Sequence, residues 1–167
     1  ALKMGDPMDE TVQLGPLATA NGKRDIVELV EDAKAKGANI LCGGETPEGP
    51  GFFYPATVID GLTDDMRLVM EEAFGPVASI YKVANKEEAV RIANQTTFGL
   101  SSAVWSQDTA EQDYFVQHLQ AGAVFVNGMT ISYPELAFGG IKDSGFGREL
   151  SDAGIKEFCN LKTVWKA

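Results

Sequence analysis

The sequence predicts an α/β protein in which a parallel sheet is built on a βαβαβ unit. Between residues 77 and 127, three apolar runs of strand length alternate with two segments of helix length, and the connections are short. Strands separated by a helix pair in parallel through right-handed crossovers. The chain has 167 residues, 44% of them hydrophobic and 23% charged, so it is long enough to bury a core and has an ordinary globular composition.

The segment before this unit is expected to form one long helix and two strands. A helix is predicted over residues 21–36, because four apolar residues recur at i, i+3, i+4 and i+7: Ile26, Leu29, Val30 and Ala33. A buried strand is expected over 39–42, with Cys42 as a small buried hydrophobe. Residues 52–59 are expected to be extended, and Pro55 favours an edge or irregular strand there.

The βαβαβ unit is assigned to strands at 77–83, 101–105 and 123–127 and to helices at 86–95 and 108–120. Asp108 is expected to cap the second helix. His118, near the end of that helix, is expected to be a partly exposed residue without a catalytic role, since no partner acid or nucleophile is recognisable beside it. A short helix over 151–158 and a strand over 161–165 complete the chain. That strand either joins its own sheet or pairs with another subunit.

Charge and cysteine usage narrow the possible partners. With 14 basic and 24 acidic residues, the formal net charge is −10, so neither nucleic acid nor an anionic membrane is expected as a partner. No apolar stretch is long enough to span a bilayer. Cys42 and Cys159 lack CxxC spacing and histidine-rich surroundings, so no metal site is expected, and a reducing cytoplasm is the expected location.

A polar stretch directly precedes the first strand of the unit. It contains two adjacent carboxylates, Glu71 and Glu72, then Phe74 and a Gly75-Pro76 break. Ligand sites in open α/β sheets lie where polar residues meet the mouth of a buried strand. A charged helix end stopped by Gly-Pro is the commoner source of such a pattern, so the local sequence leaves both interpretations open.

The connection over residues 128–148 is too long for a bare link between two elements. The spacing of Gly140 and Gly145 is that of the two glycines in a Walker A phosphate loop. However, Phe146 and Gly147 stand where that motif needs Lys and Ser/Thr, so a phosphate loop is excluded. Glycines that let the backbone turn tightly against a neighbouring element are the better explanation.

Together, these two stretches resemble the C-terminal signatures of the NAD(P)-dependent aldehyde dehydrogenase superfamily. They are residues 71–77, Glu-Glu-Ala-Phe-Gly-Pro-Val, and residues 137–149, Ala-Phe-Gly-Gly-Ile-Lys-Asp-Ser-Gly-Phe-Gly-Arg-Glu. The resemblance covers essentially the whole chain. The tail, residues 146–165, resembles the bacterial succinate-semialdehyde dehydrogenase branch. One departure is Ala137, where the family usually has Pro.

The resemblance implies a fold and a reaction. Residues 1–149 would be the C-terminal part of the catalytic domain, and residues 150–167 the helix and strand of the oligomerisation region of a homo-oligomer. The implied reaction oxidises an aldehyde, succinate semialdehyde in that branch, to its carboxylate with NAD or NADP, through a thioester on a cysteine. Neither Cys42 nor Cys159 matches that nucleophile, and the general-base glutamate has no match. We therefore expect a C-terminal piece with no catalytic residue, inactive alone.

The resemblance also assigns binding residues. Glu72 matches the glutamate that binds the nicotinamide ribose, where a carboxylate accepts hydrogen bonds from both hydroxyls. Phe74 matches the aromatic residue beside the nicotinamide. Phe138 matches a wall of the aldehyde tunnel, which excludes water, and Ser132 matches a serine that helps to hold the far carboxylate of succinate semialdehyde. Two alternatives stay open: a noncatalytic interaction or oligomerisation module, or an aldehyde dehydrogenase with another substrate.

Overall fold

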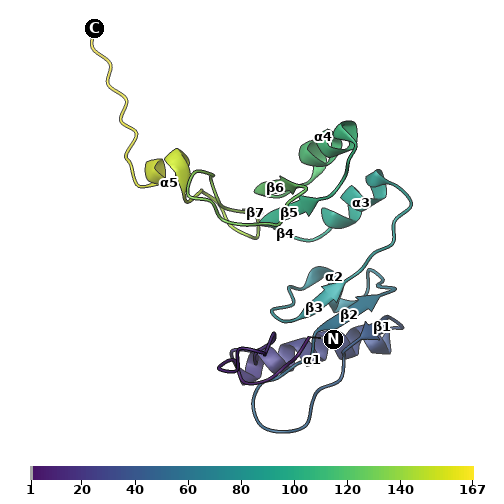
Figure 1. Cartoon of the computed structure of the whole chain (residues 1–167). Helices are drawn as coiled ribbons and strands as arrows, with labels where there is room; N and C mark the ends of the chain where they lie inside the picture. The colour runs from purple at the N-terminus through teal and green to yellow at the C-terminus, as the bar shows by residue number, and fades with distance from the viewer. Residues whose placement is uncertain (1) are drawn as a thin grey trace. The chain divides into compact units, whose positions relative to one another are not determined.

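A computed structural model describes residues 2–167, and the chain divides into two compact units, with the boundary in the sequence between Lys82 and Val83 (Figure 1). Each unit has its own helices and its own strands, and each is described separately below. The boundary that the resemblance places between residues 149 and 150 concerns the domains of a whole dehydrogenase, and it stays a prediction.

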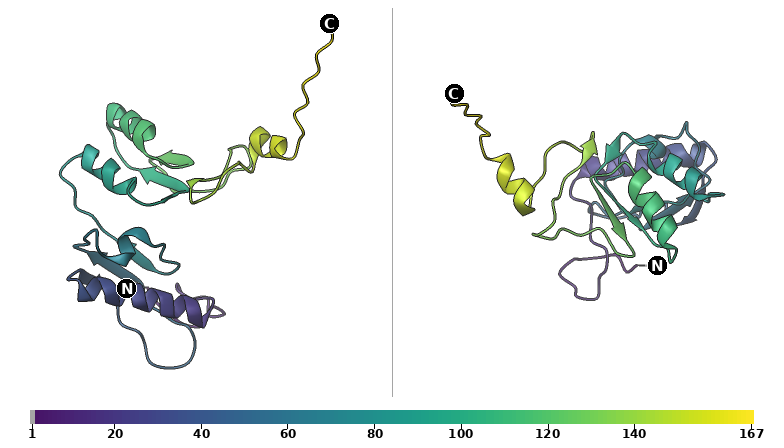
Figure 2. Two further views of the ribbon diagram at one scale, coloured as in Figure 1. Left: turned by 180° about the vertical axis from the view of Figure 1, so that it is seen from behind. Right: turned by 90° about the horizontal axis from the view of Figure 1, so that it is seen from above.

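The first unit packs one long helix against a three-stranded sheet (Figures 1 and 2). Its elements are α1 (Ala20–Ala35), β1 (Asn39–Cys42), β2 (Thr57–Asp60), α2 (Arg67–Met70) and β3 (Val77–Ser79). The strand order is β1-β2-β3, with β1 antiparallel and β3 parallel to β2. The middle strand therefore has one neighbour of each kind.

The apolar stripe predicted for the long helix is confirmed. Its four residues are buried and pack against side chains from β2, from α2 and from the loops before these two elements: Tyr54, Ile59, Met66 and Leu68. The Thr19 hydroxyl oxygen caps α1 by accepting a hydrogen bond from the Gly22 N–H at 3.0 Å. Burial of one stripe is what holds an amphipathic helix on a sheet, so this packing forms the core of the unit.

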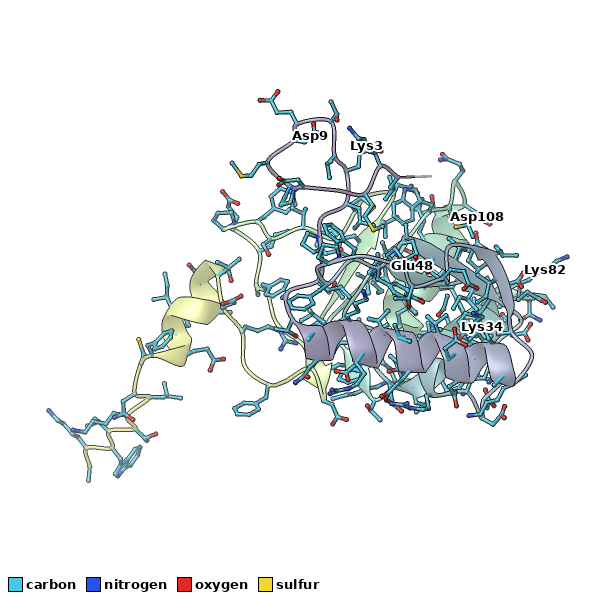
Figure 3. The ribbon with its side chains drawn as sticks, turned by 90° about the horizontal axis from the view of Figure 1, so that it is seen from below. Lys3, Asp9, Lys34, Glu48, Lys82 and Asp108 are labelled. Carbon is cyan, nitrogen blue, oxygen red and sulfur yellow. The ribbon has the colours of Figure 1, made fainter. Side chains whose placement is uncertain are left out.

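Ion pairs form within the loops around this core and between these loops and α1. Figure 3 labels three of the residues involved, Lys3, Asp9 and Lys34. Lys3 and Asp9 lie in the N-terminal loop, with the Lys3 Nζ 3.2 Å from the Asp9 Oδ2. On α1, the Lys34 Nζ lies 2.7 Å from Glu31 and 3.2 Å from Glu45. Hydrogen bonds to these two carboxylates raise the pKa of Lys34. The pair with Glu45 links the helix to the turn after β1.

Two predictions for this unit are wrong. β2 is the middle strand, not an edge strand, because its pairing begins at Thr57 and so Pro55 removes no hydrogen bond from the ladder. Cys42 is exposed, not buried. The register of β1 shifts between Ile40 and Cys42, and this irregularity at an edge strand takes Cys42 out of the regular alternation of buried and exposed residues.

The second unit holds the remaining elements, which are α3 (Lys86–Ala93), β4 (Phe98–Gly99), β5 (Ser101–Val104), α4 (Thr109–His118), β6 (Ala123–Val126), β7 (Ile141–Lys142) and α5 (Ser151–Glu157). β5 and β6 pair in parallel, β4 and β7 pair antiparallel, and α3 packs beside α4 (Figure 2). The predicted cap is confirmed, since the Asp108 carboxylate accepts a hydrogen bond from the Ala110 N–H at 2.8 Å.

The predicted βαβαβ unit is present as one βαβ crossover, formed by β5, α4 and β6. The strand predicted at 77–83 is shorter and pairs in parallel with β2, which precedes it in the chain. The Thr57 N–H donates to the Pro76 carbonyl at 2.8 Å and starts this pairing. The five-element prediction missed it because Pro55 made the earlier segment look irregular. The mixed α/β class is confirmed, with small sheets that contain parallel pairs.

Of the two alternatives for the predicted terminal strand, pairing within the chain's own sheets is wrong, and pairing with another subunit stays a prediction. Residues 159–167 have no regular secondary structure, and within the described residues no backbone hydrogen bond joins 161–165 to another segment. A strand forms only where a partner edge is available, and the side chains here stay exposed: Leu161 is 98% exposed and Trp165 87%. In the part of the chain that the structure describes, no helix has both the length and the apolar character to cross a bilayer.

Candidate functional site

Glu72 and Phe74 lie in the loop between α2 and β3. Exposure alternates along this loop, because Glu72 and Phe74 are exposed while Ala73 and Gly75 are partly buried. Alternation with a period of two is typical of extended backbone, in which every second side chain shares a face. The side chains of the two predicted cofactor-binding residues therefore lie on the same exposed face of the loop.

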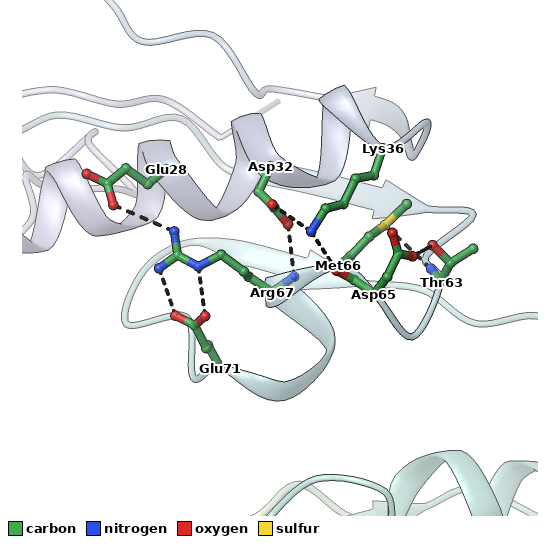
Figure 4. A network of polar contacts seen from close by, with 8 residues as sticks. All are labelled: Glu28, Asp32, Lys36, Thr63, Asp65, Met66, Arg67 and Glu71. Atoms are coloured by element: carbon green, nitrogen blue, oxygen red, sulfur yellow. Dashed lines mark hydrogen bonds and ion pairs between the residues drawn. The ribbon is translucent and has the colours of Figure 1, made fainter.

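The two adjacent carboxylates differ in their contacts, as Figure 4 shows for Glu71. The Glu71 oxygens accept two hydrogen bonds from the Arg67 guanidinium, from Nε at 2.7 Å and from Nη2 at 2.8 Å. Arg67 lowers the pKa of Glu71, and Glu71 in turn raises the pKa of Arg67. The Glu72 carboxylate has no hydrogen bond or ion pair within the described residues, so it is the carboxylate that a ligand could use.

The ion pair is tied to the first helix of the unit. The Arg67 Nη1 lies 3.6 Å from the Glu28 Oε2, and the Arg67 backbone N–H donates to the Asp32 Oδ2 at 2.9 Å (Figure 4). The Lys36 Nζ lies 2.8 Å from the Asp32 Oδ1. The hydrogen bond from Lys36, followed by that from the Arg67 backbone, lowers the pKa of Asp32. Two carboxylates of α1 thus hold the start of α2.

The far end of the loop rests on the same helix. A Cβ at Gly75 would lie 2.7 Å from the Ile26 Cγ1 and 3.4 Å from the Leu17 Cδ2, so only glycine allows this approach. Ala73 packs against the core, and its carbonyl accepts a hydrogen bond from the Gly75 N–H at 2.8 Å. Glu72 and Phe74 therefore lie between Gly75, which contacts α1 directly, and Glu71, which is linked to α1 through Arg67.

This geometry corrects the helix-end interpretation of the polar stretch, whereas the ligand-site interpretation stays a prediction. The helix ends at Met70, and Glu71 is its C-cap, so the charged helix end exists but Gly75-Pro76 does not stop it. Glu71 has the structural role, whereas Glu72 is unpaired. The pairing of Arg67 with Glu71 was not predicted, although their i, i+4 spacing on a short helix is the pattern that could have revealed it.

The predicted substrate residues, Ser132 and Phe138, lie in the long connection of the second unit. Ser132 is exposed, and its hydroxyl has no hydrogen-bond partner in the part of the chain that the structure describes. Phe138 is half-buried, and its backbone is bridged to Glu149 by two hydrogen bonds of 2.9 and 2.8 Å. The structure places one of these residues on a free surface and the other at an anchored position, and their roles stay predictions.

The glycine-rich segment is a tightly folded piece of backbone. The Arg148 Nη1 donates to the carbonyls of Gly140 and Gly147, at 3.0 and 2.6 Å. A Cβ at Gly140 would lie 2.5 Å from the Ser144 Cβ, and the Ser144 Oγ accepts a hydrogen bond from the Gly99 N–H at 3.0 Å. The prediction that these glycines allow close backbone packing is confirmed.

The other candidate residues form no further reactive cluster. His118 is exposed, as predicted; its Nδ1 lies 2.7 Å from the Tyr114 carbonyl oxygen and its ring stacks on Tyr114 at 4.1 Å. Cys42 and Cys159 are both exposed and free. Across residues 2–167, no group of three or more His, Cys, Asp and Glu side chains could hold a metal ion.

The sequence profile of the aldehyde dehydrogenase family matches residues 1–164. The chain belongs to the aldehyde dehydrogenase family. This aldehyde dehydrogenase chain is 59% identical, over 165 residues, to a protein of Mycobacterium ulcerans (strain Agy99) named succinate-semialdehyde dehydrogenase [NADP(+)] 1. The matched region covers 99% of the chain but only 36% of that relative, so the chain spans about a third of the relative's length.

Two solved aldehyde dehydrogenases have similar folds. Succinic semialdehyde dehydrogenase from Streptococcus pyogenes, in complex with NADP+ as the cofactor, is 40% identical with a TM-score of 0.92, and the match covers 99% of this chain and 36% of that one. Betaine aldehyde dehydrogenase from Staphylococcus aureus, in complex with NAD+, is 34% identical with a TM-score of 0.88, over 94% and 32%. Both dinucleotides therefore occur among aldehyde dehydrogenases that share this fold.

Proposed function

We propose that the whole protein containing this chain oxidises succinate semialdehyde to its carboxylate with NAD(P)+, and that this chain supplies part of the cofactor and substrate sites. The observation that supports it best is the unpaired Glu72 carboxylate, held beside the paired Glu71 in a chain so similar to a succinate-semialdehyde dehydrogenase. The cofactors named for the similar proteins favour NADP+, with NAD+ as the alternative.

Glu72 and Phe74 fit the sugar and ring of the nicotinamide end. A carboxylate has two oxygens and no donor, so it can accept hydrogen bonds from both hydroxyls of a ribose, and Glu72 has no internal contact that competes. Phe74 is 76% exposed, which leaves an aromatic face for the nicotinamide. The bound dinucleotide would accept the hydride, while these two side chains would hold its reactive end in place.

Ser132 and Phe138 would act on the aldehyde. The free Ser132 hydroxyl can donate a hydrogen bond to a carboxylate, which suits the far end of succinate semialdehyde. The anchored Phe138 ring would form an apolar wall that excludes water from the reacting carbon. Residues 1–149 would then belong to the catalytic domain, and the chain alone would lack the nucleophile and the general base, so we expect it to be inactive.

The test is a pair of variants in the whole protein. Glu72→Gln keeps the size of the side chain but removes one acceptor and the charge, and turnover should fall about tenfold, the scale of a hydrogen bond to a charged group. Glu48→Gln, in an exposed turn labelled in Figure 3, is the matched control and should leave turnover unchanged. Unchanged turnover in Glu72→Gln would contradict the assignment.

Aldehyde oxidation by the isolated 167-residue chain would contradict its predicted inactivity.

A noncatalytic role in oligomerisation is also supported by one observation, the exposed apolar tail. Leu161, Val164 and Trp165 are 98, 67 and 87% exposed, and a strand with such side chains can pair with the edge of another subunit's sheet. We expect truncation after Cys159 to lower the molecular mass measured by size-exclusion chromatography with light scattering. An unchanged mass would count against an interface made by residues 160–167.

A further inference from the structure

Both ends of the loop that carries Glu72 are linked to α1, Gly75 directly and Glu71 through Arg67 of α2, but by different forces. At Gly75 the contact is apolar and depends on the missing Cβ. At Glu71 it is electrostatic: Arg67 holds the Glu71 side chain through two nitrogens, and the Glu71 N–H donates to the Arg67 carbonyl at 2.8 Å. Glu72 is the residue next to this second contact, so any movement of Glu71 moves it directly.

The Arg67–Glu71 pair is too exposed to be an important source of stability. The side chains are 41% and 49% exposed, and ion pairs at such sites are screened by water and salt. A bidentate pair does, however, fix the orientation of a carboxylate, because the planar guanidinium fork matches both of its oxygens. The geometry of this pair therefore suits it to restraining the loop more than to stabilising the fold.

We infer that Arg67 is a positioning residue for the cofactor, which acts by holding Glu71 and thereby the adjacent Glu72. The inference rests on the proposed role of Glu72 as the ligand of the nicotinamide ribose. Arg67 itself is engaged by Glu71, by Glu28 and through its backbone by Asp32, so its effect passes through the loop. A misplaced ligand group weakens binding of the cofactor without touching the aldehyde.

The experiment measures the dissociation constant of the reduced dinucleotide by its fluorescence, in the whole protein, well below the unfolding temperature. Arg67→Ala should raise this constant about two- to fivefold, the range that an exposed ion pair supports, and leave the KM for the aldehyde unchanged. Arg67→Lys keeps the charge but loses the fork, so it should recover only part of the affinity. Arg24→Ala is the control, because Arg24 lies on α1 and is 61% exposed, and its ion pairs are no closer than 3.9 Å.

A double variant separates positioning from general loosening. If Arg67 acts only through Glu72, then adding Arg67→Ala to Glu72→Gln should not weaken cofactor binding further. Additive effects would overturn the positioning role. So would an unchanged dissociation constant in Arg67→Ala when Glu72→Gln alone weakens binding, an outcome that leaves the proposed function standing. An unchanged constant in Glu72→Gln would overturn the proposed role of Glu72 and the positioning role with it.

Discussion

Gly122 and Gly139 approach each other so closely that a Cβ on Gly122 would lie 1.7 Å from the Gly139 carbonyl oxygen. Gly122 immediately precedes β6, and Gly139 begins the glycine-rich segment, so the contact joins the parallel pair of the second unit to its long connection. No side chain can enter such a gap unless the main chain moves.

Gly122→Ala should therefore destabilise the protein by about 1–3 kcal/mol, the usual cost of forcing an extra methyl group into a packed site. The measurement is urea-induced unfolding. Gly128→Ala is the matched control, because the nearest atom to a Cβ there is 3.9 Å away, and its effect should stay within about 0.5 kcal/mol. Equal stability of the two variants would show that the backbone accommodates a methyl group at Gly122.

Ile59→Ala should be among the most destabilising changes in the first unit. Ile59 is fully buried on the middle strand, where its side chain packs in the cluster beneath α1. Removing a buried isoleucine costs about 2–5 kcal/mol through lost burial and the cavity that remains. Ile131→Ala, at a 52% exposed position, is the control for hydrophobicity alone. A loss no greater than that of the control would refute the placement of this core.

Asp32→Asn should destabilise the protein relative to wild type at neutral pH, and this difference should disappear at acidic pH. The folded-state pKa of Asp32 is lowered by Lys36 and by the Arg67 backbone, so its stabilisation is complete above the ordinary carboxyl pKa of about 4. It is lost as the pH falls through the lower, folded-state pKa. The melting temperatures should differ by a few degrees at pH 7 and converge below about pH 4.

Asp25→Asn provides the reference for this pH series. Asp25 also lies on α1 but only approaches Arg24, at 4.0 Å, so its replacement should change the melting temperature little at any pH. A gap between wild type and Asp32→Asn that stays constant from pH 7 to pH 3 would contradict a charged role for Asp32.

Ser132→Ala, in the whole protein, should raise the KM for succinate semialdehyde more than the KM for a neutral aldehyde, because only succinate semialdehyde has a carboxylate for Ser132 to bind. Loss of one hydrogen bond to a charged group predicts about a tenfold difference. Thr130→Ala removes another exposed hydroxyl of the same connection and serves as the control. Equal changes for both aldehydes would remove the carboxylate-binding role from Ser132.

Local patterns predicted the helices well, because helix periodicity and caps are encoded within a few residues. The stripe of α1 and the Asp108 cap are examples. Strand pairing depends on residues that are distant in the chain, and the partner of β3 was missed for that reason. The position of Pro55, just outside the paired segment, could not be read from composition alone.

The residue types of the site could be predicted from the sequence, but which of the two carboxylates forms an ion pair could not. The sequence shows Glu71 and Glu72 as equivalent neighbours. Which one is paired depends on Arg67 and on α1, and the latter is placed by the burial of residues such as Ile26. The exposure of Cys42 was unpredictable for a similar reason, since a shift of register follows from the fit between two strands.

Helix α2 has only four residues, and a single turn is unstable in isolation. It persists because Asp32 binds its first N–H, so the shape of the loop that follows is set by a helix that precedes it by more than thirty residues. The short motif around Glu72 is therefore not portable. If residues 71–77 were grafted into another scaffold without α1, the graft would keep the sequence of this segment but not its conformation.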